Sequence, residues 1–292
     1  MGRVGERIVE GPGRVKTNVV IFPFDLFGGG GAAAGALLLA DALREMLADN
    51  RREEIATRAL AYQDHVKLKE FAFQKQSDYD DWRGKGRQAV RQTWRKGDFL
   101  MWVTGNHLGA LPVYDELAQD AEGTLVVQFD AHLDIYNLSD CTSELSHGNF
   151  LLHCDGRPPP LVNLGHRELL LRPEYIAEYY QRTFPAPELA ADADAAVSYL
   201  RGVCGKARRV FIDLDCDVFD PAFVPASAHA LPFGMAPALV LRFIEEIWSD
   251  RVVGVALSEF EPGRDQRDQS LATLVWLLEY VLLKIHEAPE SA

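Results

Sequence analysis

The sequence predicts an α/β fold with a mostly parallel central sheet covered by helices on both faces. Short runs rich in Val, Ile and Leu alternate along the chain with amphipathic segments of helical length, as in successive βαβ units. These runs are apolar at nearly every position, which is typical of strands buried on both faces of a parallel sheet. No clear linker, repeat or low-complexity tract divides the 292 residues, so we expect a single domain over 1–292.

The expected elements follow in chain order. Strands are expected over residues 17–25, 98–104, 124–130, 161–165, 208–215 and 251–260. Helices are expected over 33–49, 79–95 and around 109–120, with further helical patterns between and after the later strands. The apolar segment LATLVWLLEYVLL near the C-terminus is typical of a buried or interface helix.

Two local features have simple structural interpretations. The run FGGGG (27–31) lacks the Lys-Ser/Thr of a P-loop, so we expect a tight turn from strand to helix. The locally basic stretch 80–98 places Trp82 and Trp94 at helical spacing. We expect both indoles to pack on the core while the Arg and Lys side chains stay solvated.

Composition and charge narrow the classes of function. Hydrophobic residues make up 48% of the chain and charged residues 25%, as in ordinary globular proteins. The formal net charge of −13 disfavours nucleic acid and anionic membranes as partners, because both attract a basic surface. The apolar C-terminal segment contains Glu279 and is shorter than the ~20 residues that span a bilayer. We therefore expect no nucleic-acid partner and no membrane partner.

Cysteine usage and the first residues indicate a compartment. The four cysteines, Cys141, Cys154, Cys204 and Cys216, show no C-x-x-C spacing. A disulfide framework is unusual in a chain of this length with so few cysteines. Residues 1–16 lack the apolar core of a signal peptide. We expect a cytoplasmic protein with reduced thiols.

Four of the expected strands end in residues that can carry chemistry. DFLMWVT runs into GNH at His107, TLVVQFD into AHLD, RRVFIDLD into CDVFDP, and VVGVAL into SEFEP. Ligands of open α/β sheets bind beyond the carboxyl ends of the strands. We therefore expect these four strands to deliver His, Asp and Glu side chains to one rim.

Two clusters at this rim predict a metal site. In an extended segment residues i, i+2 and i+4 share a face, so Asp130, His132 and Asp134 are expected to point together. The same spacing recurs in a second cluster, Asp213, Asp215 and Asp217. Carboxylates this close repel one another unless a cation lies among them.

The ligand types indicate which cations fit. Oxygen ligands with one or two imidazoles suit Mn²⁺, Fe²⁺ or Zn²⁺. The carboxylates suffice to bridge two ions, and such a pair makes a hydroxide nucleophile at neutral pH. The alternative is that these Asp residues are helix N-caps and turn residues at strand ends, where Asp is common.

Five motifs resemble those of the arginase/agmatinase ureohydrolases. They are TGNH (104–107), FDAHLD (129–134), the SHG of ELSHGNF (146–148), DLDCDVFDP (213–221) and EFEP (259–262), in that order. IFPFDLFGGGG and LVNLGHRE (161–168) are similar to two further regions of the family, so the resemblance covers most of the chain. It implies a three-layer α/β/α fold around a mostly parallel sheet.

The resemblance also implies a hydrolase that cleaves a guanidino group to an amine and urea with two Mn²⁺ ions per chain. One ion would be held by His107, Asp130, Asp134 and Asp215, and the second by Asp130, His132, Asp215 and Asp217. A hydroxide that bridges the ions and is hydrogen-bonded to Asp134 would attack the guanidinium carbon. Glu259 matches the residue that pairs with the guanidinium, a planar cation that suits a carboxylate. His147 matches the family's proton-shuttling histidine.

Several positions depart from the family pattern. Asn106 stands where the motif usually has Asp, and we expect it to change the hydrogen bonds around the ligands without loss of the metal. Asp213 replaces a Ser or another small polar residue. The turn PASAH replaces a threonine-rich turn and puts His229 near the mouth of the site as a candidate substrate contact; the alternative is a histidine on a solvent-exposed loop. Cys216 lies between two expected ligands and should face away from them into the core.

The sharpest departure concerns the groups that would hold a free amino acid. Free-arginine arginases have an Asn directly after D-A-H-x-D-I and acidic residues after G-x-R-D. This chain has Tyr136 at the first place and Leu170 and Pro173 at the others, although Ser143 is retained. The unpaired charged groups of a bound zwitterion would cost roughly 1–3 kcal/mol each. The pattern is most similar to the peptide arginases, which convert arginine side chains of ribosomally made precursor peptides to ornithine. We therefore expect such a peptide as substrate.

Three alternatives remain beside this prediction. The first is a free guanidino compound such as arginine, agmatine or guanidinobutyrate. The second is a metal-dependent deacylase, a class that shares the fold but uses a single Zn²⁺ and generally lacks D-x-D-x-x-D-P with an adjacent guanidinium-binding Glu. The third, suggested by Asn106, is a non-catalytic metal-binding protein. Ligand types alone do not separate Mn²⁺ from Fe²⁺ or Co²⁺. We also expect a homo-oligomer.

Overall fold

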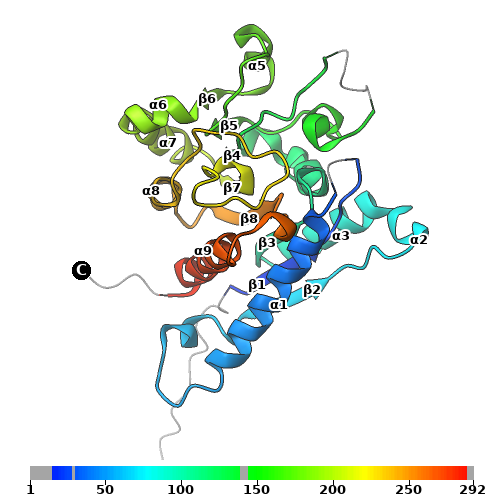
Figure 1. The fold of residues 1–292 in the computed structure, drawn as a ribbon, viewed down its shortest axis with the longest axis vertical. Helices are drawn as coiled ribbons and strands as arrows, with labels where there is room; N and C mark the ends of the chain where they lie inside the picture. The colour runs from blue at the N-terminus through cyan, green and yellow to red at the C-terminus, as the bar shows by residue number, and fades with distance from the viewer. Residues whose placement is uncertain (1–14, 28–29, 139–143, 288–292) are drawn as a thin grey trace, which may run out of the picture.

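The computed structural model describes residues 15–27, 30–138 and 144–287 (Figure 1). The strands within these ranges are β1 (Thr17–Phe22), β2 (Val66–Glu70), β3 (Phe99–Thr104), β4 (Thr124–Phe129), β5 (Leu161–Leu164), β6 (Arg182–Phe184), β7 (Arg209–Asp215) and β8 (Val252–Ser258). The α-helices are α1 (Ala32–Asn50), α2 (Gln76–Tyr79), α3 (Trp82–Trp94), α4 (Leu111–Leu117), α5 (Pro173–Tyr179), α6 (Ala186–Ala191), α7 (Asp194–Cys204), α8 (Pro237–Ile247) and α9 (Gln269–His286). Three 3₁₀ helices carry residues of the site: η2 (His107–Ala110), η4 (His147–His153) and η5 (Cys216–Val218).

The described part of the chain forms one eight-stranded sheet in the order β2-β1-β3-β8-β7-β4-β5-β6. Each neighbouring pair of strands is parallel. Because the strands run in the same direction, their carboxyl ends lie along one edge of the sheet. The four central strands, β3-β8-β7-β4, are the four that the sequence predicted to end in His, Asp and Glu.

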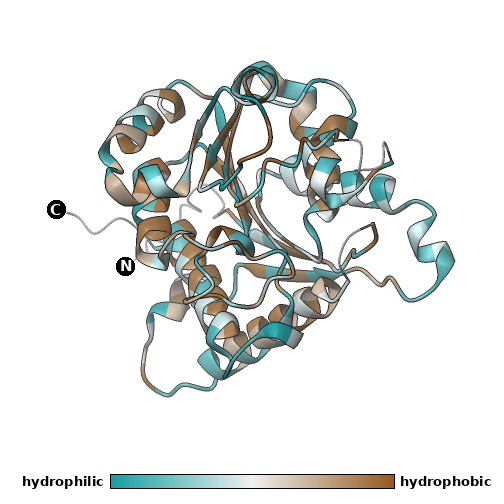
Figure 2. Ribbon diagram, turned by 45° about the horizontal axis from the view of Figure 1, so that its top comes forward, coloured by the Kyte–Doolittle hydropathy of each residue, from teal (hydrophilic) through white to brown (hydrophobic). Residues whose placement is uncertain are grey.

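Helices cover both faces of this sheet and complete three layers. Along β1, Val19 and Ile21 contribute to the core of one face, and Val20 and Phe22 to the core of the other. The first core includes side chains of α1, α7, α8 and α9, and the second includes those of α3 and α4. Figure 2 shows the hydrophobic colouring along the central strands and the inner sides of the helices. The predicted three-layer α/β/α fold is confirmed.

The two edge strands, β2 and β6, were not predicted. β2 (VKLKE) is largely exposed and alternates charged with apolar residues, a pattern that protects a sheet edge from further pairing. β6 has only three residues. Neither has the continuous apolar run that marks the inner strands. The other expected strands are present with shorter ends; for example, the strand expected over 17–25 ends at Phe22. The helix expected over 79–95 begins at Trp82, whereas the one expected over 33–49 is one residue longer at each end.

The glycine-rich run that was predicted to form a tight turn lies between β1 and α1, and its residues 28–29 are outside the described residues. Gly30 and Gly31 have φ of 75° and 113°, a region in which glycine is favoured. The carboxylate of Asp25 accepts hydrogen bonds from the amides of Gly31 (2.7 Å) and Ala33 (3.2 Å) at the start of the helix. An anionic side chain of this chain therefore occupies the helix end at which a phosphate would bind.

The basic stretch 80–98 differs in part from its prediction. Trp82 stacks on Phe24 with ring centroids 4.1 Å apart, so the indole packs inward as expected. Arg87 and Arg91, however, are not simply solvated, because both form ion pairs with the buried carboxylate of Glu116 at 2.7–2.8 Å. A buried carboxylate needs such a partner, and the sequence spacing did not reveal one on α4.

The C-terminal apolar segment forms α9, which is buried along one side. Trp276, on this helix, is 53% exposed and stacks on Tyr280. Among the helices of the described residues, none combines the length and the apolar character that crossing a membrane would require.

Candidate metal centre

The carboxyl ends of the four central strands bring one group of polar side chains together. His107 follows β3, Asp130 to Asp134 follow β4, Asp215 ends β7, and Glu259 follows β8. The four strands are direct neighbours in the sheet, which is why segments far apart in sequence meet here. The prediction that these strand ends share one rim is therefore correct.

The first acidic cluster converges by a route that the sequence did not predict. β4 ends at Phe129, so Asp130, His132 and Asp134 do not lie on one face of an extended strand. The chain turns instead: Asp130 Oδ1 accepts the backbone N–H of His132 at 2.7 Å, and Asp134 has a φ of 49°. Short side-chain-to-backbone bonds of this kind are typical of Asp in turns.

The second acidic cluster is divided between a strand and a turn. Asp213 and Asp215 lie on β7, whereas Asp217 lies in the 3₁₀ helix η5, where its amide donates to Asp215 Oδ1 at 2.8 Å. The expectation that all three acids share the face of one extended segment is therefore wrong. Cys216, between two of them, is buried in the core as predicted.

The predicted ligands form two overlapping groups of close ligand atoms. One group contains His107, Asp130 and Asp215, and the other contains Asp130, His132 and Asp217. His107 Nδ1 lies 2.8 Å from Asp134 Oδ2, and 3.2 Å from Asp130 Oδ2 and from Asp215 Oδ2. His132 Nδ1 lies 2.8 Å from Asp217 Oδ2. Asp130 belongs to both groups, as a ligand shared by two ions would. Asp215 belongs only to the group that contains His107.

Burial makes this concentration of carboxylates unfavourable without a cation. Asp130 is fully buried, and burial followed by repulsion from Asp134 raises its pKa to about 8. Burial and the neighbouring Asp217 raise the pKa of Asp215 well above its ordinary value. Burial disfavours the charged form of the His132 ring, yet the charge of Asp217 outweighs it and raises the pKa of His132 to about 10. Ionisation of all these carboxylates therefore costs free energy unless positive charge enters the site.

Unpartnered buried atoms show that the residues fit a cation. His107 Nδ1 and Asp130 Oδ2 have no hydrogen-bond partner among the described residues, although both are buried. Buried polar atoms are nearly always hydrogen-bonded or bound to an ion, so such atoms that face one another mark a binding position. Nitrogen and oxygen donors in this combination suit a divalent transition ion.

Glu259 and His147 flank the ligand groups. Glu259 Oε1 accepts the backbone N–H of His107 at 2.8 Å and lies 3.0 Å from His147 Nδ1. Glu259 is buried and has a φ of 61°, a backbone conformation that costs energy outside glycine. His229 is exposed, as expected for its loop, and its ring centroid is 5.0 Å from that of His147. Partial desolvation of the His229 ring, followed by the charge of His147, disfavours protonation and lowers the pKa of His229.

These side chains enclose a cavity of about 200 Å³, which is small beside the pockets that hold drug-sized ligands. Its lining residues are His107, His132, Asp134, Tyr136, His147, Gly148, Asp215, Asp217, His229 and Glu259. All but one of the predicted site residues that the structure describes are among them. The exception is Asp130, which belongs to both groups of ligand atoms. Ser143, predicted as a substrate contact, lies outside the described residues.

Tyr136, which lines the cavity, is hydrogen-bonded to the loop after β5. The Tyr136 hydroxyl donates to Glu168 Oε2 at 2.5 Å. The other carboxylate oxygen of Glu168 accepts the amides of Leu170 and Leu171, so this one side chain fixes the loop. Leu169 and Leu170 are 94% and 72% exposed. The loop that contacts Tyr136 therefore exposes two leucines, and its acid, Glu168, is engaged within the protein.

Sequence reasoning missed the side chains that hold the loop of residues 130–135. Asn163 Nδ2 donates to the carbonyls of His132 (3.2 Å) and Asp130 (3.4 Å), and the Tyr180 hydroxyl donates to that of Leu133 (2.6 Å). Tyr175 donates to the carbonyl of Ile135. Asn163 lies within a predicted strand and belonged to the mid-chain motif, but nothing in the sequence pointed to the two tyrosines.

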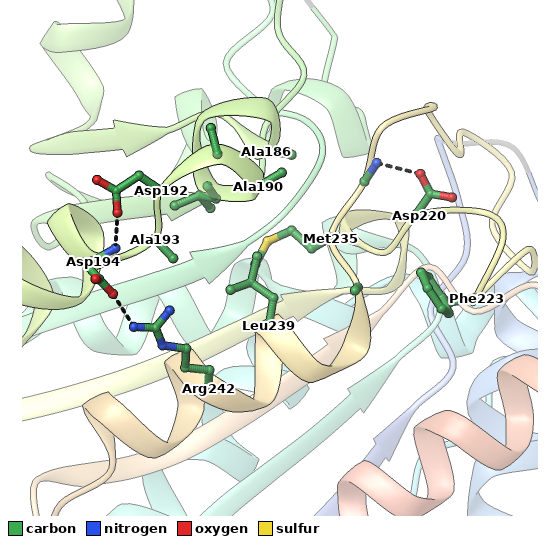
Figure 3. A pocket seen from close by; sticks show the side chains of 14 residues that line it. Ala186, Ala190, Asp192, Ala193, Asp194, Asp220, Phe223, Met235, Leu239 and Arg242 are labelled. Carbon is green, nitrogen blue, oxygen red and sulfur yellow. Dashed lines mark hydrogen bonds and ion pairs between the residues drawn. The ribbon is translucent and has the colours of Figure 1, made fainter.

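Two other cavities lie away from these ligands. One of about 610 Å³ is formed by α6, α8 and the turns beside them (Figure 3). Its acids are engaged within the fold: Asp194 pairs with Arg242, and Asp220 Oδ2 accepts the amide of Gly234. The other, of about 1260 Å³, includes Phe99 and Arg209, the first residues of β3 and β7, and thus lies at the amino edge of the sheet. Neither holds the predicted ligand residues.

Comparisons with known proteins identify the family of this chain. A family model described as the Arginase family matches residues 16–283. An agmatinase of Serratia proteamaculans (strain 568) is 26% identical over 194 residues, which cover 64% of this chain and 60% of that protein. An N(omega)-hydroxy-L-arginine amidinohydrolase of Streptomyces lavendulae is 30% identical over 200 residues, covering 62% and 68%. The chain thus spans about 60% of the length of the agmatinase that it matches.

A solved structure extends the likeness of fold to nearly the whole chain. The crystal structure of arginase from Bacillus subtilis superposes with a TM-score of 0.77 at 19% identity, covering 94% of this chain and 99% of the other. At this identity the superposition bears on the fold alone. The family match, which spans almost the entire described chain, shows that the protein belongs to the Arginase family.

Proposed function

We propose that this protein is a binuclear metal hydrolase that cleaves a guanidino group to an amine and urea. One observation carries the proposal: the buried carboxylate of Glu259 lies beside two overlapping groups of metal-ligand atoms and lines the same small cavity. A guanidinium is a planar cation whose paired N–H groups match a carboxylate. The cavity thus offers a partner for the cation next to the place where hydrolysis would occur.

The ions would be held by His107, Asp130, Asp134, Asp215, His132 and Asp217. Two divalent ions, Mn²⁺ by family resemblance, supply a nucleophile from water at neutral pH when bound. Asp130 is the bridging candidate because both ligand groups include it. Asn106 donates to the carbonyl of Leu26 at 2.8 Å, so its amide is used in positioning the backbone before His107.

The remaining residues would bind the substrate and move protons. Glu259 would orient the guanidinium. Water would add to the guanidinium carbon, with Asp134 holding the proton that the water gives up. The C–N bond to the side chain would then break, and His147 would deliver a proton to the departing nitrogen. The hydroxyl on the carbon would lose its proton as it becomes the carbonyl of urea. That proton and the one held by Asp134 would restore His147 and protonate the amine, so that guanidinium and water give an ammonium ion and urea.

We assign an arginine-containing precursor peptide as the substrate. The support is Tyr136, which lines the cavity and contacts Glu168 in a loop where Leu169 and Leu170 are exposed. These groups offer little to a free α-carboxylate and tolerate a flanking chain. Ornithine formation from such a peptide and from free arginine, measured in parallel with urea release, tests this assignment. Activity on free arginine alone would refute the peptide substrate and leave the hydrolase intact.

The main alternative is a free guanidino compound. It is favoured by the names of the relatives, which include agmatinase and N(1)-aminopropylagmatine ureohydrolase. Agmatine has no α-carboxylate that would need a partner beside Tyr136, so it fits the same observation. Release of urea from agmatine with a kcat/KM above that for any arginine peptide would select this alternative.

A further inference from the structure

Asp213 is a buried carboxylate that the ligand groups leave out. It is fully buried on β7, two residues before Asp215, and its side chain lies behind His107 on the side away from the cavity. Its Oδ2 atom is 2.9 Å from His107 Nε2 and accepts the hydroxyl of Tyr114 at 2.5 Å. Its Oδ1 atom has no partner among the described residues.

Asp213 thereby holds the ring of His107 through its Nε2 atom. With Nε2 donating its proton to Asp213, the lone pair of Nδ1 points to Asp130, Asp134 and Asp215, which lie 2.8–3.2 Å away. A histidine can bind an ion only through an unprotonated nitrogen, and a carboxylate on the other nitrogen selects that tautomer and increases the basicity of the ring.

Aromatic packing holds this arrangement in place. The ring of Phe150 lies 4.8 Å from that of His107 and 5.3 Å from that of Tyr114, centroid to centroid. Tyr114 itself is fully buried on α4. The contact between Asp213 and His107 is therefore dry, and water does not compete for the hydrogen bond.

Asp213 contacts a member of only one of the two ligand groups. Asp213 contacts His107, which belongs to the group with Asp130 and Asp215. His132, in the other group, has a side chain that is 22% exposed and contacts Asp217. We propose that Asp213 is a positioning residue that selectively strengthens binding of the ion held through His107.

The inference rests on the metal-binding part of the proposed function, and its test measures metal affinity. Asp213→Asn keeps the volume and an acceptor oxygen but removes the charge. Titration with Mn²⁺, followed by calorimetry and by electron paramagnetic resonance of the coupled ion pair, should show one ion bound about 10- to 100-fold more weakly. The second ion should stay within about twofold of the parent. His107→Ala should weaken the same ion, which assigns it.

Two variants serve as controls. Tyr114→Phe leaves the carboxylate in place and should retain both ions more tightly than Asp213→Asn. Asp120→Asn, an exposed carboxylate paired with Arg208, should bind both ions as the parent does. Unchanged affinity for both ions in Asp213→Asn would overturn the inference. A parallel loss of both ions with a lower thermal midpoint of the metal-free protein would equally overturn it, since that is the signature of a general structural role. A parent that binds two ions but releases no urea would refute the proposed function and leave this test valid.

Discussion

Glu259 accepts a hydrogen bond from the backbone amide of His107 at 2.8 Å. The proposed guanidinium partner is thus connected directly to a proposed metal ligand, although 152 residues separate them. The contact fixes one carboxylate oxygen, while the positive φ of Glu259 aims the side chain back over the end of β3. A substrate held by Glu259 would therefore lie at a set distance from the ions.

Glu259→Gln should remove turnover without removing metal. The amide keeps an oxygen for the His107 N–H but loses the charge, and a hydrogen bond to a charged group contributes about 1.5–3 kcal/mol. We expect kcat/KM for the guanidino substrate to fall about 10- to 150-fold, with two Mn²⁺ still bound. Glu261→Gln, which alters a nearby ion pair with Arg264, is the matched control and should stay near parental activity. Parental turnover in Glu259→Gln would refute the role.

His147→Asn should lower kcat and change the pH profile. Burial opposes protonation of the ring, but the hydrogen bond to Glu259 outweighs it, so the pKa of His147 is raised above its ordinary value. A proton donor works below its pKa, so parental activity should be lost as the pH rises through that raised value. We expect the variant to lose about 10²–10⁴-fold in kcat and to lack this alkaline limb. His229→Asn, which alters the exposed neighbouring ring, should keep the limb; a limb that persists in His147→Asn would assign the proton to another group.

Tyr136 tests the assignment of a peptide substrate. Tyr136→Asn removes the contact with Glu168 and introduces an amide that can pair with a free carboxylate. We expect kcat/KM for free arginine to rise about tenfold, equivalent to one ordinary hydrogen bond, while that for an arginine peptide falls. Tyr136→Phe loses only the hydroxyl and should not gain activity on arginine. Equal changes for both substrates in the two variants would show that Tyr136 does not discriminate between them.

The inner sheet and the ligand identities could be predicted because both depend on local pattern. Continuous apolar runs marked the central strands, and polar residues directly after them marked the rim, so that His107, Asp130 and Asp215 were found without knowledge of any contact. The edge strand β2 could not be found in this way, because an exposed strand has no apolar run. Its place depends on pairing with β1, a tertiary contact.

The directions of the side chains within the site could not be predicted from the alternation of side chains along an extended strand. Residues 130–134 were expected to form an extended row, but side-chain-to-backbone bonds bend them into a turn. Asp213 has the same spacing to Asp215 as Asp215 has to Asp217, yet it contacts the far side of the His107 ring. Spacing identifies which residues are close, whereas the direction of each side chain depends on partners such as Tyr114, about a hundred residues away in the chain.

Removal of the metal should destabilise the protein. Without cations, burial and mutual repulsion raise the pKa values of Asp130 and Asp215. Carboxylates that are buried without a cation therefore destabilise the folded state. A ligand at 100 times its Kd stabilises the folded state by about 2.7 kcal/mol, equivalent to a rise of about 5–10 °C in Tm for a chain of this size. Calorimetry of chelated and Mn²⁺-loaded protein measures the difference. Asp130→Asn, which alters the ligand shared by both groups, should abolish most of the rise; a full rise in that variant would place the ions elsewhere.

Tyr180→Phe should weaken the loop that carries the first acidic cluster. Its hydroxyl donates to the carbonyl of Leu133 at 2.6 Å in the protein interior, and a buried carbonyl left without a donor costs about 1–3 kcal/mol. Urea denaturation should show this loss of unfolding free energy, and Mn²⁺ titration should show weaker binding, because the loop positions Asp130, His132 and Asp134. Tyr199→Phe is the matched control: its hydroxyl accepts from Gln181 at an exposed position, and its loss should cost less than about 0.5 kcal/mol. If Tyr180→Phe lowers stability but leaves Mn²⁺ affinity unchanged, the loop supports the fold and does not set the ligand geometry.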